Sequence, residues 1–428
     1  MVSVWIRLAV PALLALMPGA ARAQGPAPAP AAGTLLVGNK GENTLSFIDL
    51  ASGRELARAA TGPMPHEIAV SPDGRRAAVV AYGGRSIDIF DVRTRARLRT
   101  VDLSPHAGPH GIVWLADGRI VATAERSQSL VLIDPARAFA VSAIATGQQG
   151  THMVAVSPDA RRAYTADIAS GTVTIVDLAA GRKLRSFSLG GAPEGIALSI
   201  DGRTLWIADN DAARVQAFDA AAMEVDSGRL APVVDISYSV RGATPAEIEQ
   251  LVAVPLERAL REMPGAEEIT SQAGSERGRT ELRLAPGTAL PDMDAVLARV
   301  RAASGTFPRG RTEIVPRILS GPAIARVETG QVPIRVAASP DGRWIVTSNM
   351  GDGTLSVIDA RTHEVSRTIR VSGERAAGQV TILFSADGRR IYAAETGRNQ
   401  VAEVDFDSGR VLRRLVAGAQ GDGLAIGR

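Results

Sequence analysis

Cysteine is absent from the 428 residues, and aromatic residues make up only 4% of them. A chain without cysteine has no disulfides, no thiolate metal sites and no cysteine nucleophile. Lysine occurs only at Lys40 and Lys183, so arginine supplies nearly all of the 48 basic residues, and 45 acidic residues leave a formal charge of +3. The sequence has neither a basic stripe nor the aromatic platforms on which bases stack. We therefore expect no nucleic-acid partner.

Long apolar runs are also missing. The one candidate, residues 8–17, is about ten residues long, whereas a membrane-spanning helix needs about 20. Arg7 precedes this run, and Ala21-Arg22-Ala23 offers small residues at the positions that a signal peptidase recognises. We predict a signal peptide over residues 1–23 and a Pro/Ala-rich linker over 24–33. The mature chain is then expected to be periplasmic or secreted, without a transmembrane segment.

The rest of the sequence is dominated by a repeat. A tight-turn signal, Ser-Pro-Asp-Gly or a variant of it, starts at Ser71, Leu115, Ser157, Ser199, Ser339 and Ser385. A second signal, an apolar stretch that ends in aspartate, closes at Asp49, Asp91, Asp134, Asp177, Asp219, Asp359 and Asp405. By subtraction these aspartates are spaced 42, 43, 43, 42, 140 and 46 residues apart. The chain therefore contains seven units of about 42 residues with one interruption.

Each unit contains four short segments rich in β-branched and aliphatic residues, separated by Gly, Asp, Asn or Pro. Four strands in a repeat of about forty residues predict a blade of a β-propeller. The N-terminal strands 34–37, 44–49 and 55–59 lack an innermost partner, which residues 423–427 can supply. We predict a mostly β fold: a seven-bladed β-propeller over residues 34–225 and 324–428, closed by strands from both termini.

The blade sequences resemble those of the YVTN-type propeller family, close to YncE-like exported proteins. The resemblance rests on the Ser-Pro-Asp-Gly turns and on segments 172–177 and 353–359, Thr-Val-Thr-Ile-Val-Asp and Gly-Thr-Leu-Ser-Val-Ile-Asp. It covers about three quarters of the chain. The family implies an extracytoplasmic propeller that binds ligands or proteins, and no shared reaction follows from it.

The interruption is long enough for a small domain, which we place at residues 226–323. Strands at 233–240, 268–272, 280–284 and 313–319 and helices at 245–262 and 292–303 give the order βαββαβ, a ferredoxin-like α+β arrangement. Thr244, Pro245 and Glu247 form a capping-box start for the first helix, and Pro255 predicts a kink in it.

This insert resembles a periplasmic porter subdomain of RND efflux transporters. The match includes Gly242-Ala243-Thr244-Pro245-Ala246-Glu247-Ile248-Glu249 and segments 234–238, 255–260, 264–265 and 285–288. Transmembrane helices and proton-relay carboxylates are missing, so the resemblance does not imply a pump. It implies docking to an RND efflux component or another envelope protein. A self-folding domain fused neutrally into a tolerated loop is the alternative. Because the insert enters between third and fourth strands, we expect it to project from the face opposite the histidines.

Three of the five histidines occupy one repeat position, the start of the innermost strand. Across the seven blades this position holds His66, His110, His152, Glu194, Ile334, Val380 and Asp422. Imidazoles and carboxylates are the ligands that zinc and similar divalent transition metals select in a protein without thiols. We predict a metal site at the channel mouth with His66, His110, His152, Glu194 and Asp422 as ligands. Each histidine could instead simply start a strand.

A second polar tier follows the second strands. It contains Asn39, Glu125, Asp167, Asp209, Asn349 and Glu395, which we predict to orient the imidazoles or to bind a ligand. We expect a binding or scaffold protein of the cell envelope rather than an enzyme. The alternative is a metal-dependent hydrolase, lactonase or lyase that uses the histidine cluster, although no general base can be assigned.

Overall fold

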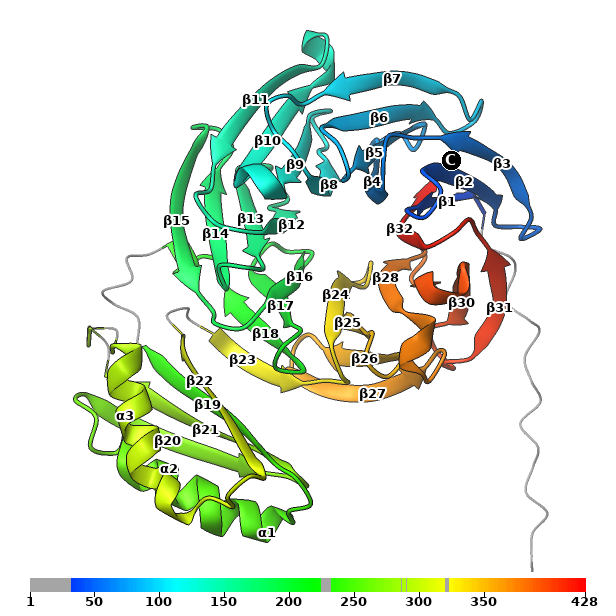
Figure 1. The fold of residues 1–428 in the computed structure, drawn as a ribbon. Helices are drawn as coiled ribbons and strands as arrows, with labels where there is room; N and C mark the ends of the chain where they lie inside the picture. Colours follow the sequence, from blue (N-terminus) through cyan, green and yellow to red (C-terminus); the bar gives the residue numbers. More distant parts are fainter. Residues whose placement is uncertain (1–31, 225–231, 286, 290, 320–322) are drawn as a thin grey trace, which may run out of the picture.

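A computed structural model describes residues 32–224, 232–285, 287–289, 291–319 and 323–428. The predicted signal peptide and most of the predicted linker lie outside these residues. Seven four-stranded antiparallel sheets surround a central axis (Figure 1). The innermost strands contact one another in the order β4, β8, β12, β16, β24, β28, β32 and again β4, so the ring is closed. The chain thus folds as a mostly β propeller with seven sheets.

The strands of each blade follow the chain outward from the axis. The first four blades contain β4 (Pro65–Val70), β5 (Arg76–Ala81), β6 (Ser86–Asp91) and β7 (Arg97–Asp102); β8 (Pro109–Trp114), β9 (Ile120–Ala124), β10 (Ser129–Asp134) and β11 (Ala140–Ala145); β12 (Thr151–Val156), β13 (Arg162–Asp167), β14 (Thr172–Asp177) and β15 (Arg182–Ser188); and β16 (Pro193–Leu198), β17 (Thr204–Asp209), β18 (Arg214–Asp219) and β23 (Ala323–Glu328).

The last three blades include the one that both ends of the chain build. They contain β24 (Pro333–Ala338), β25 (Trp344–Asn349), β26 (Thr354–Asp359) and β27 (Glu364–Arg370); β28 (Gln379–Phe384), β29 (Arg390–Glu395), β30 (Gln400–Asp405) and β31 (Val411–Val416); and β32 (Gly421–Gly427), β1 (Thr34–Asn39), β2 (Thr44–Asp49) and β3 (Glu55–Ala60). β32 is the innermost strand and pairs with β1 from Thr34↔Gly427 to Asn39↔Gly421. The predicted closure by the two termini is therefore present.

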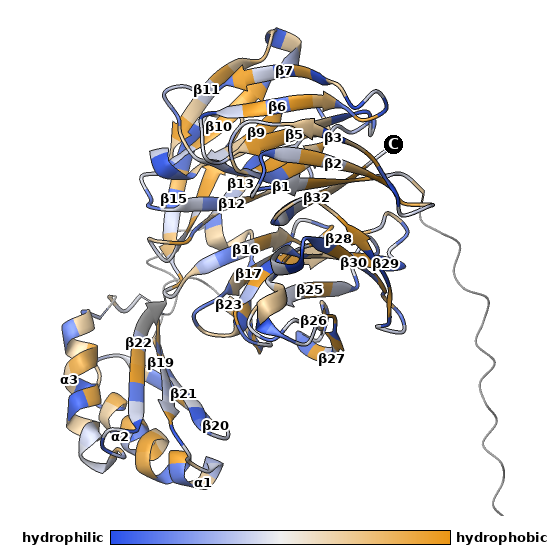
Figure 2. Cartoon of the chain, turned by 45° about the vertical axis from the view of Figure 1, so that its right-hand side comes forward, coloured by the Kyte–Doolittle hydropathy of each residue, from blue (hydrophilic) through white to orange (hydrophobic). Residues whose placement is uncertain are grey.

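The Ser-Pro-Asp-Gly turns join first and second strands as their residue types require. In the turn at Ser71, the serine hydroxyl donates to Asp73 Oδ1 over 2.6 Å and accepts from the Arg76 N–H over 2.9 Å. Gly74 closes the turn at φ 75°, a conformation that favours glycine. Apolar side chains of neighbouring blades pack into shared cores, such as Val80 and Ile87 against Val131 of the next blade. Figure 2 shows apolar residues along the strands and polar residues at the turns.

The long interruption forms a separate sheet between β18 and β23. Its strands are β19 (Val233–Val240), β20 (Ala266–Ala273), β21 (Arg277–Leu284) and β22 (Thr312–Leu319), in the spatial order β20-β21-β19-β22. Helical segments α1 (Pro245–Ile248), α2 (Val254–Leu260) and α3 (Met293–Ala303) share one apolar core with this sheet. β23 begins at Ala323, one residue before the boundary expected from the sequence.

The first helical segment of the insert shows the predicted cap and a broken helix. The Thr244 side chain accepts a hydrogen bond from the Glu247 backbone N–H, and the Glu247 carboxylate accepts one from the Thr244 backbone N–H. A π-helical stretch, Glu249–Ala253, separates α1 from α2 just before Pro255. Proline clashes with the preceding turn and cannot donate a hydrogen bond, so a widened turn accommodates it. None of the helices in the described ranges has the length and hydropathy of a membrane-crossing segment.

The insert lies beside the outer strands of the blade that contains β23 (Figures 1 and 2). The chain leaves the propeller after Asp219, at the end of β18 remote from the histidine ring. The insert sheet nevertheless runs back along the blade. Arg277 Nη1 donates to Gln331 Oε1 over 3.0 Å, and Gln331 lies two residues before the start of β24. The expectation that the insert projects from the opposite face was therefore wrong for this end of the insert.

Candidate functional site

Each innermost strand carries a β-bulge near its first residue. In β4, Pro65 pairs with Ala81 and Ile68 pairs with Val79, so His66 and Glu67 together oppose the single residue Val80. The same irregularity occurs in β8, β12, β16, β24, β28 and β32. A bulge re-aims side chains that regular alternation would send to the other face. This backbone feature turns the second residue of each innermost strand toward the central axis.

The structure brings together all five residues that the sequence analysis predicted as metal ligands. The His66 and His110 rings lie 4.8 Å apart and the His110 and His152 rings 3.7 Å apart, centroid to centroid. Asp422 Oδ2 is 3.8 Å from His66 Nε2, and Glu194 Oε1 is 3.7 Å from His152 Nε2. These side chains come from five adjacent blades. Four of them are buried and His152 is partly buried; together they form an arc, which we call the histidine arc.

The arc contains a second set of residues, of which the sequence analysis predicted Glu125 and missed the other three. These residues follow directly after the last residue of a second strand: Lys40, Tyr82, Glu125 and Asn210. Lys40 Nζ lies 2.7 Å from Asp422 Oδ2, and Glu125 Oε2 lies 2.9 Å from His152 Nδ1. The Asn210 amide donates to Glu194, and the Tyr82 ring packs 4.6 Å from the His66 ring.

The six residues of the predicted second tier fall into two groups, according to whether they end a second strand or follow it by one residue. Asn39, Asp167, Asp209, Asn349 and Glu395 are the final residues of their strands, whereas β9 ends at Ala124 and Glu125 stands one residue later. Asn39 donates to Thr44 and Ser46, and Asn349 makes the same bonds to Thr354 and Ser356. Asp167 accepts from Thr172 and Thr174, Asp209 pairs with Arg214, and Glu395 accepts from Gln400 and Arg414. These five thus bond to the third or fourth strand of their own blade, and Glu125 contacts the histidine arc.

Two further charged residues occupy the third position of an innermost strand. Arg335 Nη2 lies 2.9 Å from Glu67 Oε1 across the ring, and its Nη1 lies 3.2 Å from Glu194 Oε1. All three side chains are buried. A regular strand would send the second and third residues to opposite faces, so the sequence pattern offered no reason to place Arg335 beside the histidines. Because of the bulge, the second and the third residue of an innermost strand can both lie beside the central axis.

Burial and neighbouring charges set the protonation of the three histidines. Burial lowers the pKa of His66 to about 4. Burial, reinforced by the adjacent imidazoles, lowers the pKa of His110 well below its usual value. For His152, burial acts in the same direction, but Glu125 and Glu194 outweigh it and raise the pKa. His66 and His110 are therefore neutral at pH 7 and have a free nitrogen lone pair.

One group of residues has donor atoms close enough to share a metal ion. One ligand atom each from His110, Glu125 and His152 lie within 4.8 Å of one another. His110 Nδ1 and His152 Nε2 are buried and have no hydrogen-bond partner among the described residues. A buried nitrogen without a partner loses its hydration without compensation, and a bound cation would restore that loss. The donor set, two imidazoles and one carboxylate, is one that zinc accepts.

Comparisons with known proteins agree with the architecture. The chain is 24% identical over 334 residues to the seven-bladed beta-propeller protein Rv1057 of Mycobacterium tuberculosis, which covers 74% of this chain and 78% of that protein. The fold is a propeller. Among solved structures, a functionally unknown protein from Desulfotomaculum acetoxidans matches with a TM-score of 0.58 at 10% identity, over 93% of this chain and 99% of that one.

A second solved structure, the dihydro-heme d1 dehydrogenase NirN in complex with DHE, matches with a TM-score of 0.51 at 15% identity. The alignment covers 96% of this chain and 77% of that chain. No family model matches the sequence. At these identities the structural likenesses bear on the fold, and any function has to be argued from the site itself.

Proposed function

We propose that this chain is an exported propeller that acts as a binding scaffold of the cell envelope and holds a divalent transition metal, such as zinc, at its channel mouth. The observation that carries the metal proposal is the pair of buried nitrogens without a hydrogen bond to a described residue, His110 Nδ1 and His152 Nε2, beside Glu125. The charged atom Glu194 Oε1 lies 3.7 Å from His152 Nε2. The ion would take these three residues as ligands. His66, Glu194 and Asp422, which the sequence analysis also proposed as ligands, lie around this trio and would orient or neutralise it.

The charge of the arc supports a cation. Four carboxylates (Glu67, Glu125, Glu194 and Asp422) face two fixed cations (Lys40 and Arg335). With all three imidazoles neutral, the form in which they bind a metal, the balance is two negative charges, which a divalent ion would cancel. Ligation would displace the proton that the neighbouring carboxylates favour on His152. Buried charges are stable only when they are compensated, so a site with this balance favours a dication over an anion.

The wider setting is part of the same proposal. The YVTN-type, YncE-like resemblance supports a periplasmic or secreted location. The strand order β20-β21-β19-β22 and the helices on one face agree with a ferredoxin-like, RND porter-like insert. In this proposal the insert docks an RND efflux component or another envelope protein. A pull-down from envelope extract, with and without the insert, tests this; recovery of efflux components in neither sample would contradict docking.

Calorimetric titration of the chelator-treated protein with Zn²⁺ tests the metal site. We expect one ion per chain, roughly tenfold weaker binding in His110→Ala or His152→Ala, and about 100-fold weaker binding in the double variant. His106→Ala is the matched control, because His106 lies in the loop before β8 and outside the arc. Equal zinc affinity in the double variant and the control would overturn the metal proposal.

A further inference from the structure

The insert sheet has one apolar and one polar face. On β19, Val234, Ile236 and Tyr238 belong to the core shared with the helices. The alternate residues Asp235, Ser237 and Ser239 belong to the opposite face, because successive side chains of a strand alternate. This polar face looks toward the propeller, since Asp235 meets Arg214 of β18.

At one end of this interface, buried ion pairs join the insert to the propeller. Asp235 has no exposed surface and Arg214 is 1% exposed; Asp235 Oδ2 lies 2.8 Å from Arg214 Nη1. Asp235 also accepts from Arg279 of β21. Arg326 of β23 pairs with Glu281 over 3.2 Å. These contacts hold the two sheets together and leave the other end of the interface open.

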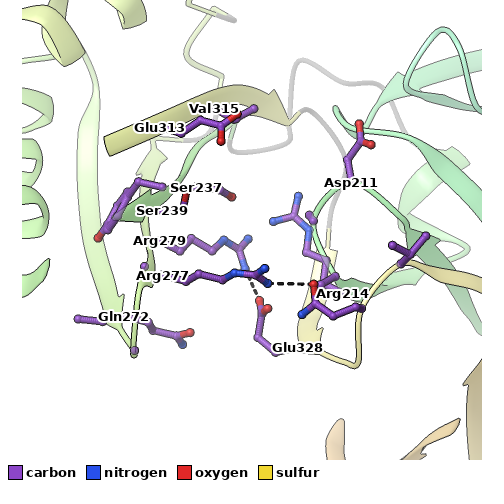
Figure 3. A pocket seen from close by; sticks show the side chains of 18 of the residues that line it. Asp211, Arg214, Ser237, Ser239, Gln272, Arg277, Arg279, Glu313, Val315 and Glu328 are labelled. Carbon is purple, nitrogen blue, oxygen red and sulfur yellow. Dashed lines mark hydrogen bonds and ion pairs between the residues drawn. The ribbon is translucent and has the colours of Figure 1, made fainter. Parts of the chain in front are cut away.

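The open end is a cleft with a volume of about 610 Å³, which is within the range of small-molecule sites. Its propeller wall includes Asn210, Asp211 and Gln331, and its insert wall comes from all four strands of the insert sheet, β19 to β22. Figure 3 shows Arg277 and Arg279 extending from the insert toward the propeller wall. Val315, an apolar residue that is 41% exposed, also lines the cleft.

Strand register places opposite charges at the two ends of one row. Ser239 of β19 pairs with Arg277 of β21 on one side and with Glu313 of β22 on the other. Neighbouring strands are about 4.8 Å apart, so the backbones that carry Arg277 and Glu313 are about 10 Å apart. Across the insert wall, the row therefore presents the Arg277 guanidinium, the Ser239 hydroxyl and the Glu313 carboxylate in that order.

These groups have spare binding capacity. The Arg277 guanidinium donates to the neutral Gln331 amide oxygen, and within the described ranges it has no carboxylate partner. The side chains of Glu313 and Gln272 are exposed and those of Ser237 and Ser239 are partly exposed, so they can contact a molecule in the cleft. By contrast, Arg279 is paired with Asp235, Glu281 and Glu328. The lining cations Arg214, Arg277 and Arg279 balance the lining carboxylates Asp211, Glu313 and Glu328.

We propose that this cleft binds a short peptide with free termini, two or three residues long. Its carboxylate would pair with Arg277, its ammonium group with Glu313, and its backbone would bond to the hydroxyls and amide of the wall. An extended chain spans about 3.3–3.6 Å per residue, so about three residues match the 10 Å row. A zwitterion suits a cleft whose charges balance, and charge-assisted bonds to free termini are among the stronger polar contacts. Val315 offers an apolar contact to a side chain.

Calorimetry with Ala, Ala-Ala, Ala-Ala-Ala and Ala-Ala-Ala-Ala tests the proposal on the intact protein. We expect the tightest binding for two or three residues and at least tenfold weaker binding after capping of both termini by acetylation and amidation. Acetylation alone should abolish the effect of Glu313→Gln, and amidation alone should abolish the effect of Arg277→Gln. Equal binding of free and doubly capped peptides, or no binding at millimolar concentration, would overturn the proposal.

A control variant on another surface of the insert separates recognition from structure. Arg301 lies on α3, on the helix-covered side of the insert, so Arg301→Gln should bind the peptides with the affinity of the unaltered protein. Loss of binding in Arg301→Gln to the same extent as in Arg277→Gln would show a general effect of charge and would contradict the site. Zinc affinity should not change in any of these variants.

Discussion

At the scale of residues, one buried cation organises the histidine arc. Arg335 donates hydrogen bonds to both Glu67 and Glu194, and it crosses the ring from β24 to do so. Burial raises the pKa of Glu67, and Arg335 opposes that rise. For Glu194, burial acts upward in the same way, but His152 and Arg335 lower the pKa overall. The carboxylates of Glu67 and Glu194 are therefore tolerated in the buried site because the Arg335 guanidinium compensates their charge.

Arg335→Met removes this cation and leaves Glu67 and Glu194 without their common partner. Breaking a buried pair from one side typically costs about 3–5 kcal/mol, so we expect a loss of that order in the free energy of unfolding. Urea denaturation measures it. Adding Glu67→Gln to the variant should restore part of the loss, because one of the uncompensated charges is then gone. An unchanged unfolding midpoint in Arg335→Met would contradict this account.

At the scale of elements, the bulged start of the innermost strand is what makes a site possible. It brings adjacent innermost strands close, and one glycine shows how close. A Cβ atom at Gly423 of β32 would lie 1.8 Å from the backbone oxygen of His66 in β4. This is the contact across which β32 meets β4 and the ring closes. Glycine is required there for space rather than for an unusual φ.

Gly423→Ala should therefore destabilise the propeller. Overpacking usually costs about 1–3 kcal/mol, and a clash with the backbone of β4, which cannot move aside as a side chain can, is expected to cost at least the upper value. Gly305→Ala is the control: nothing lies within 4 Å of a Cβ there, so its effect should stay within about 0.5 kcal/mol. Thermal unfolding of both variants provides the comparison, and equal melting temperatures would refute the packing argument.

At the scale of the whole molecule, the insert and the propeller are joined by charge rather than by apolar packing. Asp235 is at the centre of this junction, faced by Arg214 from β18 and Arg279 from β21, with Glu281, Glu328 and Arg326 nearby. Burial would raise the pKa of Asp235, but the two guanidinium groups lower it to about 2. The ionised carboxylate is therefore bound more tightly in the folded protein than in the unfolded chain.

The folded-state pKa of Asp235 lies below the unfolded value of 3.8, so its ionised carboxylate stabilises the fold above pH 3.8. This stabilisation is lost as the pH falls toward 2. The contribution is about 2 kcal/mol at neutral pH. Asp235→Asn should destabilise the protein at pH 7 because it removes the carboxylate that Arg214 and Arg279 share and leaves Arg214 with Asp209 alone among the described residues. The difference from the unaltered protein should shrink between pH 4 and pH 2. Urea denaturation across this range measures it. Asp407→Asn, at an exposed turn, is the control; a difference independent of pH would contradict the assignment.

Much of this architecture could be predicted from local patterns. Turn chemistry such as Ser71 with Asp73 and Gly74, and strands that end in aspartate, depend on nearest neighbours in the chain, so their spacing alone indicates blades and their number. The ring position of His66, His110 and His152 follows from the same repeat, because equivalent residues of a closed ring lie at one level. The helix cap at Thr244 is equally local.

Only the tertiary structure decided the composition of the site and the place of the insert. Strand alternation could not place Glu67 and Arg335 beside the histidines, because a bulge breaks the alternation, and a shift of one residue separates Glu125 from the tier to which it was assigned. The contacts of Arg335 with Glu67 and of Asp235 with Arg214 join segments that the chain itself keeps apart. The periodicity of the sequence determined the seven-bladed ring and the common position of the histidines in it. Ion pairs between blades, which depend on distance in space, determined which other side chains belong to the site.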